Sequence, residues 1–382
     1  MVKARFVVAV IAAASLFSAA CAKRGATGEW KALDTETPDA FFSINFVNED
    51  FGWLNGQTGR NYVPPEGADN SNGNANANKA AKPKPGAKKP PDAFEANQGF
   101  EVLRTTDGGA TWKQLPDQFK YKIRHVWFVD PQTGWALTID RDILHTADGG
   151  ATWTTQRKAG KVKIKITGYK PPEMDQPEQL DNLRFIDAQH GWAWGGGRKD
   201  EYTEQPGTFI ITTDGGQHWN EIPFPFEQAA ASIFFLNDRT AWASTDGGGF
   251  YKTTDGGLNW SKAARPPGDL VYRSICFTDD THGWAVGRSG RMVRTKDGGK
   301  TWEKLYQVKD EFKMRGLYFV DARRGWAVGD GGNILYTTDG GDEWQVAIAP
   351  FPEARLLFVV FPSERTGYAA GLDGVVWKYE AR

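Results

Sequence analysis

The chain has 382 residues, of which 44 are Gly and 16 are Trp, and its formal net charge is −1 at pH 7. This balance of charge gives no reason to expect a nucleic-acid partner, because binding to phosphates relies on a basic surface. The five His are not at metal-ligand spacing and the two Cys form no disulfide framework, so we expect no metal site, no cofactor and no redox chemistry.

Residues 1–20 have the pattern of an export signal. Lys3 and Arg5 give the segment a positive start, and the apolar run from Phe6 to Phe17 is too short to span a bilayer as a helix. Removal of the segment takes away these two positive charges and changes the formal net charge from −1 to −3. We therefore expect an exported protein.

Small residues precede Cys21, as at the cleavage site of a bacterial lipoprotein. We expect lipidation of Cys21 and a tether over residues 21–28, which would anchor the protein to a bacterial membrane and leave the rest in the periplasm. Ordinary cleavage after Ala20 or Ala22, which would leave a plain thiol, is the alternative. The other cysteine, Cys276, is expected to be a small buried core residue.

From residue 29 onward the chain repeats two sequence marks. The first mark, Phe-x-(Asp/Asn/Ser)-x-x-x-(Gly/Ala)-(Trp/Tyr), occurs seven times between Phe46 and Tyr368. The second mark, Asp-Gly-Gly-x-x-Trp, occurs six times, with Asp107, Asp148, Asp214, Asp255, Asp297 and Asp339. An Asp at the head of such a turn accepts backbone N–H bonds, so we interpret all six as structural rather than catalytic.

Residues 314–349 show the repeated unit most clearly. Three apolar runs, each followed by a polar or Gly-rich turn, lead to a last strand that carries Trp344. Asp-Gly between apolar runs is a strong hairpin signal, since the tight turn needs positive φ. The pattern predicts four antiparallel strands per unit, and such a unit needs neighbours to bury its faces.

The seventh unit ends at Arg382, where its Asp-Gly-Gly turn should begin. The segment around Trp30 resembles Gly109–Leu115, and Trp30 precedes Trp53 by the usual 23 residues. We therefore predict an all-β fold, a seven-bladed β-propeller over residues 29–382 with four antiparallel strands per blade. The N-terminal strand around Trp30 would complete the C-terminal blade, and closure of this kind removes exposed sheet edges.

Three segments interrupt the repeat on blades one to three. Residues 57–98 are rich in Pro, Asn, Ala and Lys, which predicts a disordered loop. Residues 158–179 are interpreted as a Lys-rich link, and Arg198–Gly207 as a shorter insertion. Loops of this kind emerge on one face of a propeller, so we expect binding on that face unless the loops are neutral decorations.

Three arginines break the repeat at one position, four residues before the Phe of the first mark. They are Arg124, Arg273 and Arg315. This position begins the inner strand on the loop-bearing face, so these residues could form a cationic rim for a carboxylate or an acidic peptide tail. Arg288 and Arg291 would extend the rim. Interblade ion pairing or stacking on Trp is the alternative.

The combined marks resemble the photosystem II stability/assembly factor family, most clearly in residues 276–302 and 318–344. The resemblance implies a non-enzymatic seven-bladed propeller that binds newly made membrane proteins through a basic patch. We therefore expect an exported assembly factor, monomeric and without cofactor, that docks a protein partner. The partner would be a membrane-protein subunit or its acidic tail, as in photosystem II if the host is phototrophic, in which case the compartment would be the thylakoid lumen.

Propellers with Asp-headed turns also include sialidases and xyloglucanases, so a carbohydrate-active hydrolase is the alternative function. A sialidase-like site would use the three rim arginines with Tyr272 as nucleophile, and the only acids nearby are Asp200, Glu201 and Glu204. The usual Arg-Ile-Pro opening is absent. A passive structural protein of the cell envelope is the third possibility.

Overall fold

The computed structural model describes residues 28–33, 35, 40–57, 100–116, 121–166, 173–197, 203–268, 271–307, 313–348, 354–372, 374 and 376–381. These ranges hold 31 β-strands and one 3-10 helix, η1 (Arg288–Gly290), which confirms the all-β prediction. No helix within them is long and apolar enough to cross a membrane. The predicted signal segment, Cys21 and residues 58–98 of the predicted loop lie outside the described residues.

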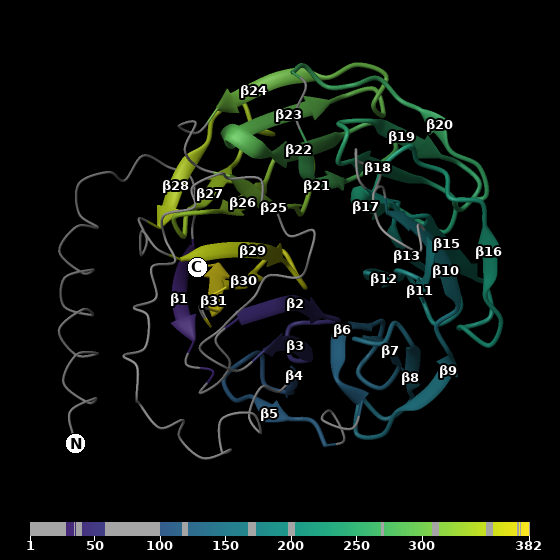
Figure 1. Ribbon diagram of the computed structural model, residues 1–382. Helices are drawn as coiled ribbons and strands as arrows, with labels where there is room; N and C mark the ends of the chain where they lie inside the picture. The colour runs from purple at the N-terminus through teal and green to yellow at the C-terminus, as the bar shows by residue number, and fades with distance from the viewer. Residues whose placement is uncertain are drawn as a thin grey trace, which may run out of the picture.

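Five antiparallel sheets of four strands follow one another around a ring (Figure 1). The first contains β6 (Ile123–Phe128), β7 (Gly134–Thr138), β8 (Ile143–Thr146) and β9 (Thr154–Arg157). The second contains β12 (Asn182–Phe185), β13 (Gly191–Gly196), β15 (Gly207–Thr212) and β16 (Asn220–Ile222). The third contains β17 (Ala230–Phe235), β18 (Ala241–Thr245), β19 (Phe250–Thr253) and β20 (Ser261–Lys262). The fourth contains β21 (Tyr272–Phe277), β22 (Gly283–Gly287), β23 (Arg291–Thr295) and β24 (Glu303–Gln307). The fifth contains β25 (Met314–Phe319), β26 (Gly325–Gly329), β27 (Ile334–Thr337) and β28 (Gln345–Ile348).

The two ends of the described chain meet in one larger sheet of eight strands. Its members are β1 (Gly28–Leu33), β31 (Val376–Ala381), β30 (Thr366–Leu372), β29 (Arg355–Val360), β2 (Ala40–Phe46), β3 (Gly52–Gln57), β4 (Phe100–Thr105) and β5 (Lys113–Gln114). A single residue pair, Ala40 with Leu372, connects the group that contains β30 to the group that starts with β2. Strand β1 pairs antiparallel with β31, with Trp30 opposite Tyr379, so the purple and yellow ends lie side by side in Figure 1.

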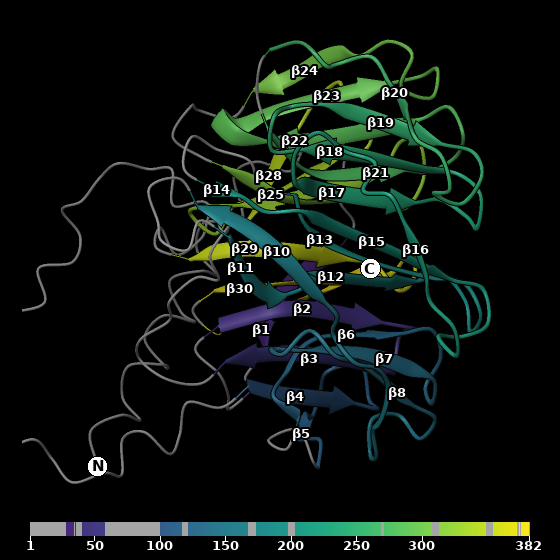
Figure 2. The same ribbon diagram turned by 45° about the vertical axis from the view of Figure 1, so that its right-hand side comes forward.

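A small sheet stands apart from the ring sheets, with β10 (Lys161–Ile166) between β11 (Glu173–Pro177) and β14 (Thr203–Glu204). The segment 158–179, interpreted from the sequence as a link, therefore also contributes the strands β10 and β11, which were not predicted. Lys alternates with Val or Ile along β10, and this period-two pattern suits a strand. Figure 2 shows the end of β10 and β14 on the side where β2 and β17 begin.

The aromatic residues of the first mark join each sheet to the next one. The Trp ring of one sheet stacks on the Phe ring of the following sheet, with ring centroids 3.5–4.0 Å apart. The stacked pairs are Trp53–Phe128, Trp135–Phe185, Trp192–Phe235, Trp242–Phe277, Trp284–Phe319 and Trp326–Phe361. In the first five pairs the indole N–H also donates to the carbonyl of the first Gly in an Asp-Gly-Gly turn of the following sheet.

The two groups of strands within the eight-stranded sheet are joined by the same kind of contact, with Tyr in place of Trp. The ring of Tyr368 stacks on Phe46 with centroids 3.7 Å apart, and its hydroxyl donates to the carbonyl of Gly108 at 2.8 Å. Trp326 has no such acceptor, and its Nε1 is buried without a hydrogen-bond partner. The seventh unit lacks an Asp-Gly-Gly turn, which explains the difference.

The Asp-headed turns share one hydrogen-bond pattern. In the turn that begins at Asp107, Oδ1 accepts the N–H of Thr111 at 2.9 Å and the hydroxyl of Thr105 at 2.8 Å. The two following glycines have φ of 66° and 81°, a conformation that favours Gly. The five other Asp side chains accept the equivalent N–H at 2.9–3.0 Å. These contacts explain why Asp recurs at the head of the turn.

Candidate functional site

The three rim arginines occupy equivalent places at the second residue of their inner strands. Arg124 lies on β6, Arg273 on β21 and Arg315 on β25. Arg288 lies in η1 and Arg291 begins β23, in the second-to-third strand connection that emerges on the same face. The structure therefore brings the backbone positions of all five residues to the face where the inner strands begin.

Each of the three rim arginines already has a carboxylate partner within the chain. Arg124 Nη1 lies 2.8 Å from Asp181 Oδ1, and Arg273 Nη1 lies 3.0 Å from Asp246 Oδ1. Both pairs connect neighbouring sheets, as the sequence-based alternative of interblade ion pairing proposed. Arg315 instead pairs within its own sheet, since its Nε lies 2.7 Å from Asp330 Oδ1.

The three acidic partners carry a signal that the sequence interpretation did not use. Asp181 stands at the rim position of its own unit, and Asp246 and Asp330 stand in turns between second and third strands. A further arginine, Arg141, also pairs with Asp181 at 2.8 Å. Four guanidinium groups thus face three carboxylates, so most of the positive charge at the rim is compensated within the chain.

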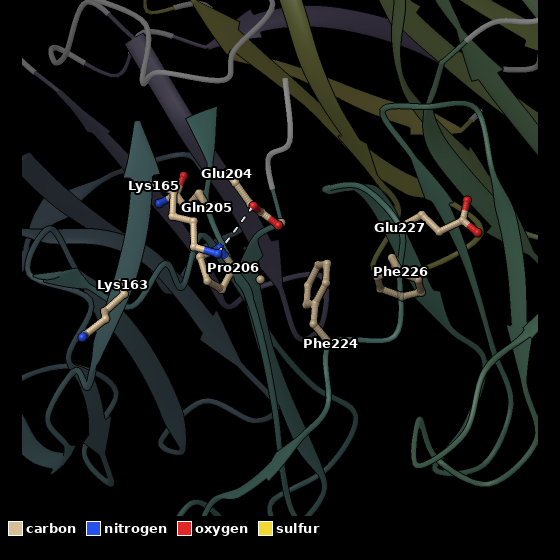
Figure 3. A pocket seen from close by; sticks show the side chains of 10 residues that line it. Lys163, Lys165, Glu204, Gln205, Pro206, Phe224, Phe226 and Glu227 are labelled. Carbon is tan, nitrogen blue, oxygen red and sulfur yellow. Dashed lines mark ion pairs between the residues drawn. The ribbon is translucent and has the colours of Figure 1, made fainter. Parts of the chain in front are cut away.

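A pocket of about 270 Å³ lies between the small sheet and the ring (Figure 3). In this view Lys163 and Lys165 stand on one side, Phe226 and Glu227 stand on the other, and Phe224 lies between them. The rings of Phe224 and Phe226 meet edge to face, 5.6 Å apart. The pocket therefore combines an apolar floor with charges of both signs at its margins.

The backbone of the pocket is shaped around Phe224. Added Cβ atoms at Gly197 and Gly207 would collide with the Phe224 ring, so both glycines permit its close approach. Lys165 Nζ lies 4.0 Å from Glu204 Oε2, which ties β10 to β14 electrostatically. Lys170 of the predicted Lys-rich link lies outside the described residues.

Tyr272 does not fit the role of nucleophile in a sialidase-like site. Its side chain is 1% exposed, and its hydroxyl donates to the carbonyl of Pro267 at 3.2 Å. Burial raises the pKa of Tyr272 to about 12, which disfavours the nucleophilic phenolate. Of the acids considered for that scheme, Asp200 and Glu201 lie outside the described residues, and Glu204 lies beside Lys165.

Three histidines and Cys276 have structural contacts. His190, His218 and His282 each contact the Asp that heads their own turn. Burial raises the pKa of Cys276 to about 12, and its side chain is 4% exposed, as expected for a small core residue. Within the described ranges, no group of three or more His, Cys, Asp or Glu is placed to hold a metal ion.

A scan against family models matches residues 107–268 and 266–347 to the photosynthesis system II assembly factor YCF48 family. The chain belongs to this family. The matched residues cover most of the ring, from the first Asp-headed turn to the last. A search of the curated proteins finds no match.

Solved structures similar to the chain include members of the YCF48 family. One, described as "YCF48 bound to D1 peptide", is 18% identical, with 95% of this chain and 97% of that chain covered and a TM-score of 0.64. YCF48 from Cyanidioschyzon merolae is 19% identical, with 92% and 99% covered and a TM-score of 0.63. A streptogramin B lyase is 12% identical, with 94% and 100% covered and a TM-score of 0.59. At these identities the likeness shows the fold alone.

Proposed function

We propose that this chain is a non-enzymatic docking factor that binds a membrane-protein subunit on the loop-bearing face of its ring. The observation that carries this function is membership of the YCF48 family, whose model is named for an assembly factor. A structure of YCF48 with a bound D1 peptide supports a protein partner, because it is an example of peptide binding in this family. The identity of the subunit depends on whether the host is phototrophic.

The scaffold for this function is one closed propeller of seven blades. The eight-stranded sheet divides at its single connecting pair into two blades of four strands, which join the five other sheets. The β1–β31 pairing and the contact of Tyr368 with Phe46 support closure by the N-terminal strand. A closed ring is rigid, so loops on one face can hold a binding surface in shape.

The rim arginines contribute to docking through ion pairs that can change partner. Their side chains are held near 20% exposure, each beside a carboxylate. Surface ion pairs stabilise a protein by only about 0–1 kcal/mol, so a carboxylate of the partner can replace the internal one at little cost. The internal pairs keep Arg124, Arg273 and Arg315 oriented until the partner arrives. Arg288 and Arg291 extend this surface.

The export pattern of residues 1–20 and the lipoprotein-like Cys21 support a location on the outer side of a bacterial membrane. In a phototrophic host this compartment is the thylakoid lumen. A lipid anchor keeps the monomeric ring close to newly inserted membrane subunits, which raises its effective concentration there.

The test is capture of membrane-protein subunits from detergent-solubilised host membranes, followed by reciprocal capture with each subunit found. Three chains are compared: the natural one, the triple variant Arg124→Ala/Arg273→Ala/Arg315→Ala, and the control Arg239→Ala. Arg239 is exposed in the turn between β17 and β18, at the opposite end of the inner strands from the rim. We expect recovery of a defined subunit to fall at least tenfold in the triple variant and to be unchanged in the control. Equal recovery with all three chains, or turnover of sialosides or β-glucans by the natural chain, contradicts the proposal.

A further inference from the structure

One side chain reaches the axis of the ring with a positive charge. Arg184 on β12 stands immediately before the Phe of the first mark in its unit, and Tyr318 on β25 and Cys276 on β21 stand at the same position. Arg184 interacts electrostatically with both, although β12 faces these strands from another part of the ring (Figure 1). Equivalent side chains from separate sheets therefore converge at the centre.

The surroundings of Arg184 are aromatic and apolar rather than acidic. Its guanidinium carbon lies 4.0 Å from the centroid of the Trp127 ring, and Trp127 occupies the equivalent position on β6. Its Nε is buried without a hydrogen-bond partner, and no carboxylate among the described residues pairs with Arg184. This differs from the rim, where every described arginine of the three has an acidic partner.

A second unpartnered polar atom lies close by. His125 on β6 has a buried Nδ1 without a hydrogen-bond partner. Burial lowers the pKa of His125 to about 4, with further lowering from the charges of Arg124 and Arg184. The imidazole is therefore neutral at pH 7, and one of its nitrogens carries a proton for donation.

The Arg184 side chain is half-buried, and its Nε is closed off from solvent without an acceptor. An unsatisfied buried donor is costly for the folded protein, so an acceptor supplied by a ligand would stabilise this arrangement. The stacked Trp127 covers one face of the guanidinium and leaves its N–H edge for an acceptor. In such low-polarity surroundings an anion is bound more strongly than at the surface. Burial lowers the pKa of Arg184 to about 10, so the side chain stays positive at neutral pH.

We propose that Arg184 is the centre of an anion-binding site on the propeller axis that takes a carboxylate group, with His125 as a second donor. The carboxylate can come from the C-terminus of a docked peptide or from a free small acid. The site does not depend on the proposed docking function, and only its peptide source does. Loss of the site with undiminished capture of membrane subunits would thus separate the two proposals.

The first experiment uses bromide as a probe anion in crystals of the unmodified chain. Anomalous diffraction should show a bromide ion within hydrogen-bond distance of the Arg184 guanidinium. This measurement needs no variant, so it does not depend on the folding of one. If bromide ions are found elsewhere in the crystal but none lies at the Arg184 guanidinium, the proposal is overturned.

The second experiment titrates acetate at constant ionic strength and follows the Trp127 indole resonance by NMR. We expect Arg184→Gln to raise the dissociation constant for acetate at least tenfold. Arg239→Gln, which changes an exposed arginine on the opposite face, should leave it unchanged. An equal acetate response in the natural chain and Arg184→Gln overturns the site.

The source of the carboxylate is distinguished with N-acetyl-trialanine and its C-terminal amide. Tighter binding of the free acid than of acetate, abolished by amidation, assigns the site to a peptide C-terminus. Binding of the peptide no tighter than acetate assigns it to a free small carboxylate. Binding of the amide as tight as that of the free acid overturns carboxylate recognition.

Discussion

The unpaired charge of Arg184 is expected to lower the stability of the folded protein while it provides the donor for the proposed anion site. Replacement of this cation by Met keeps an unbranched side chain against Trp127 and removes the unpaired charge. We expect Arg184→Met to raise the free energy of unfolding by about 1–3 kcal/mol, because it removes the buried Nε that has no acceptor. Chemical denaturation followed by Trp fluorescence measures the change.

Arg265→Met is the matched control for this substitution. Arg265 donates to the carbonyls of Gly248 at 2.9 Å and Gly247 at 2.7 Å, so its removal leaves acceptors without a donor. The control should therefore lower stability or leave it unchanged. If Arg184→Met is destabilising, the contact of Arg184 with Trp127 stabilises the fold. The positive charge of Arg184 then does not lower the stability of the protein.

The Asp residues of the turns predict how stability depends on pH. Hydrogen bonds from the Thr301 hydroxyl and N–H lower the pKa of Asp297 from 3.8 to about 2. A carboxyl with a lowered folded-state pKa stabilises the protein above pH 4, and this stabilisation is lost as the pH falls toward 2. We expect the melting temperature of Asp297→Asn to fall less steeply between pH 5 and pH 2 than that of the natural chain. Parallel curves would show that the turn is not held by the charged form.

At the scale of the strand, two equivalent Trp residues differ in one hydrogen bond, so their comparison measures what that bond contributes to stability. Trp242 stacks on Phe277 and donates to the Gly298 carbonyl at 3.0 Å. Trp326 stacks on Phe361 in the same way but has no acceptor. Since both are buried, Trp→Phe removes similar volume at each site. We expect Trp242→Phe to cost about 1–2 kcal/mol more than Trp326→Phe, because only the former leaves a carbonyl unsatisfied.

Urea unfolding of the two Phe variants measures this difference. Equal losses would show that stacking alone holds neighbouring sheets together and that the indole N–H adds nothing. A larger loss for Trp326→Phe would mean that packing near the junction of the chain ends dominates.

The strands of the ring could be predicted from the sequence because their signals are local. The Asp-Gly-Gly turn and the Phe-to-Trp spacing each act within a few residues, and the repeat supplies many copies. The small sheet was not predicted because the alternation of Lys with Val and Ile along β10 lies outside the repeat that marks the other strands. Loop composition alone did not reveal that β14 pairs with β10 across the sequence.

The partners of the arginines could not be predicted from the sequence for a different reason. Arg124 and Asp181 are 57 residues apart and meet only because two inner strands lie side by side. The absence of an acidic partner for Arg184 among the described residues likewise depends on which strands meet around it, such as β6 with Trp127. Sequence marks give positions in the ring, whereas pairing depends on the arrangement of the sheets.

At the scale of the whole molecule, the pairing of β1 with β31 joins the two ends of the described chain. Lys31 lies opposite Lys378 in the β1–β31 register, so cysteines at both positions are placed to form a disulfide. We expect Lys31→Cys/Lys378→Cys to cross-link within one molecule and to raise the free energy of unfolding by about 2–5 kcal/mol, because the bond closes a loop of nearly the whole chain.

Mass spectrometry without reduction detects the cross-link, and thermal unfolding with and without reductant measures its effect. The single variant Lys31→Cys is the control, and the buried Cys276 should not compete for the new thiols. Cross-linking between molecules instead of within one would mean that β1 completes the sheet of a neighbouring chain, so the proposed monomeric, closed propeller would have to be replaced by a strand-exchanged assembly.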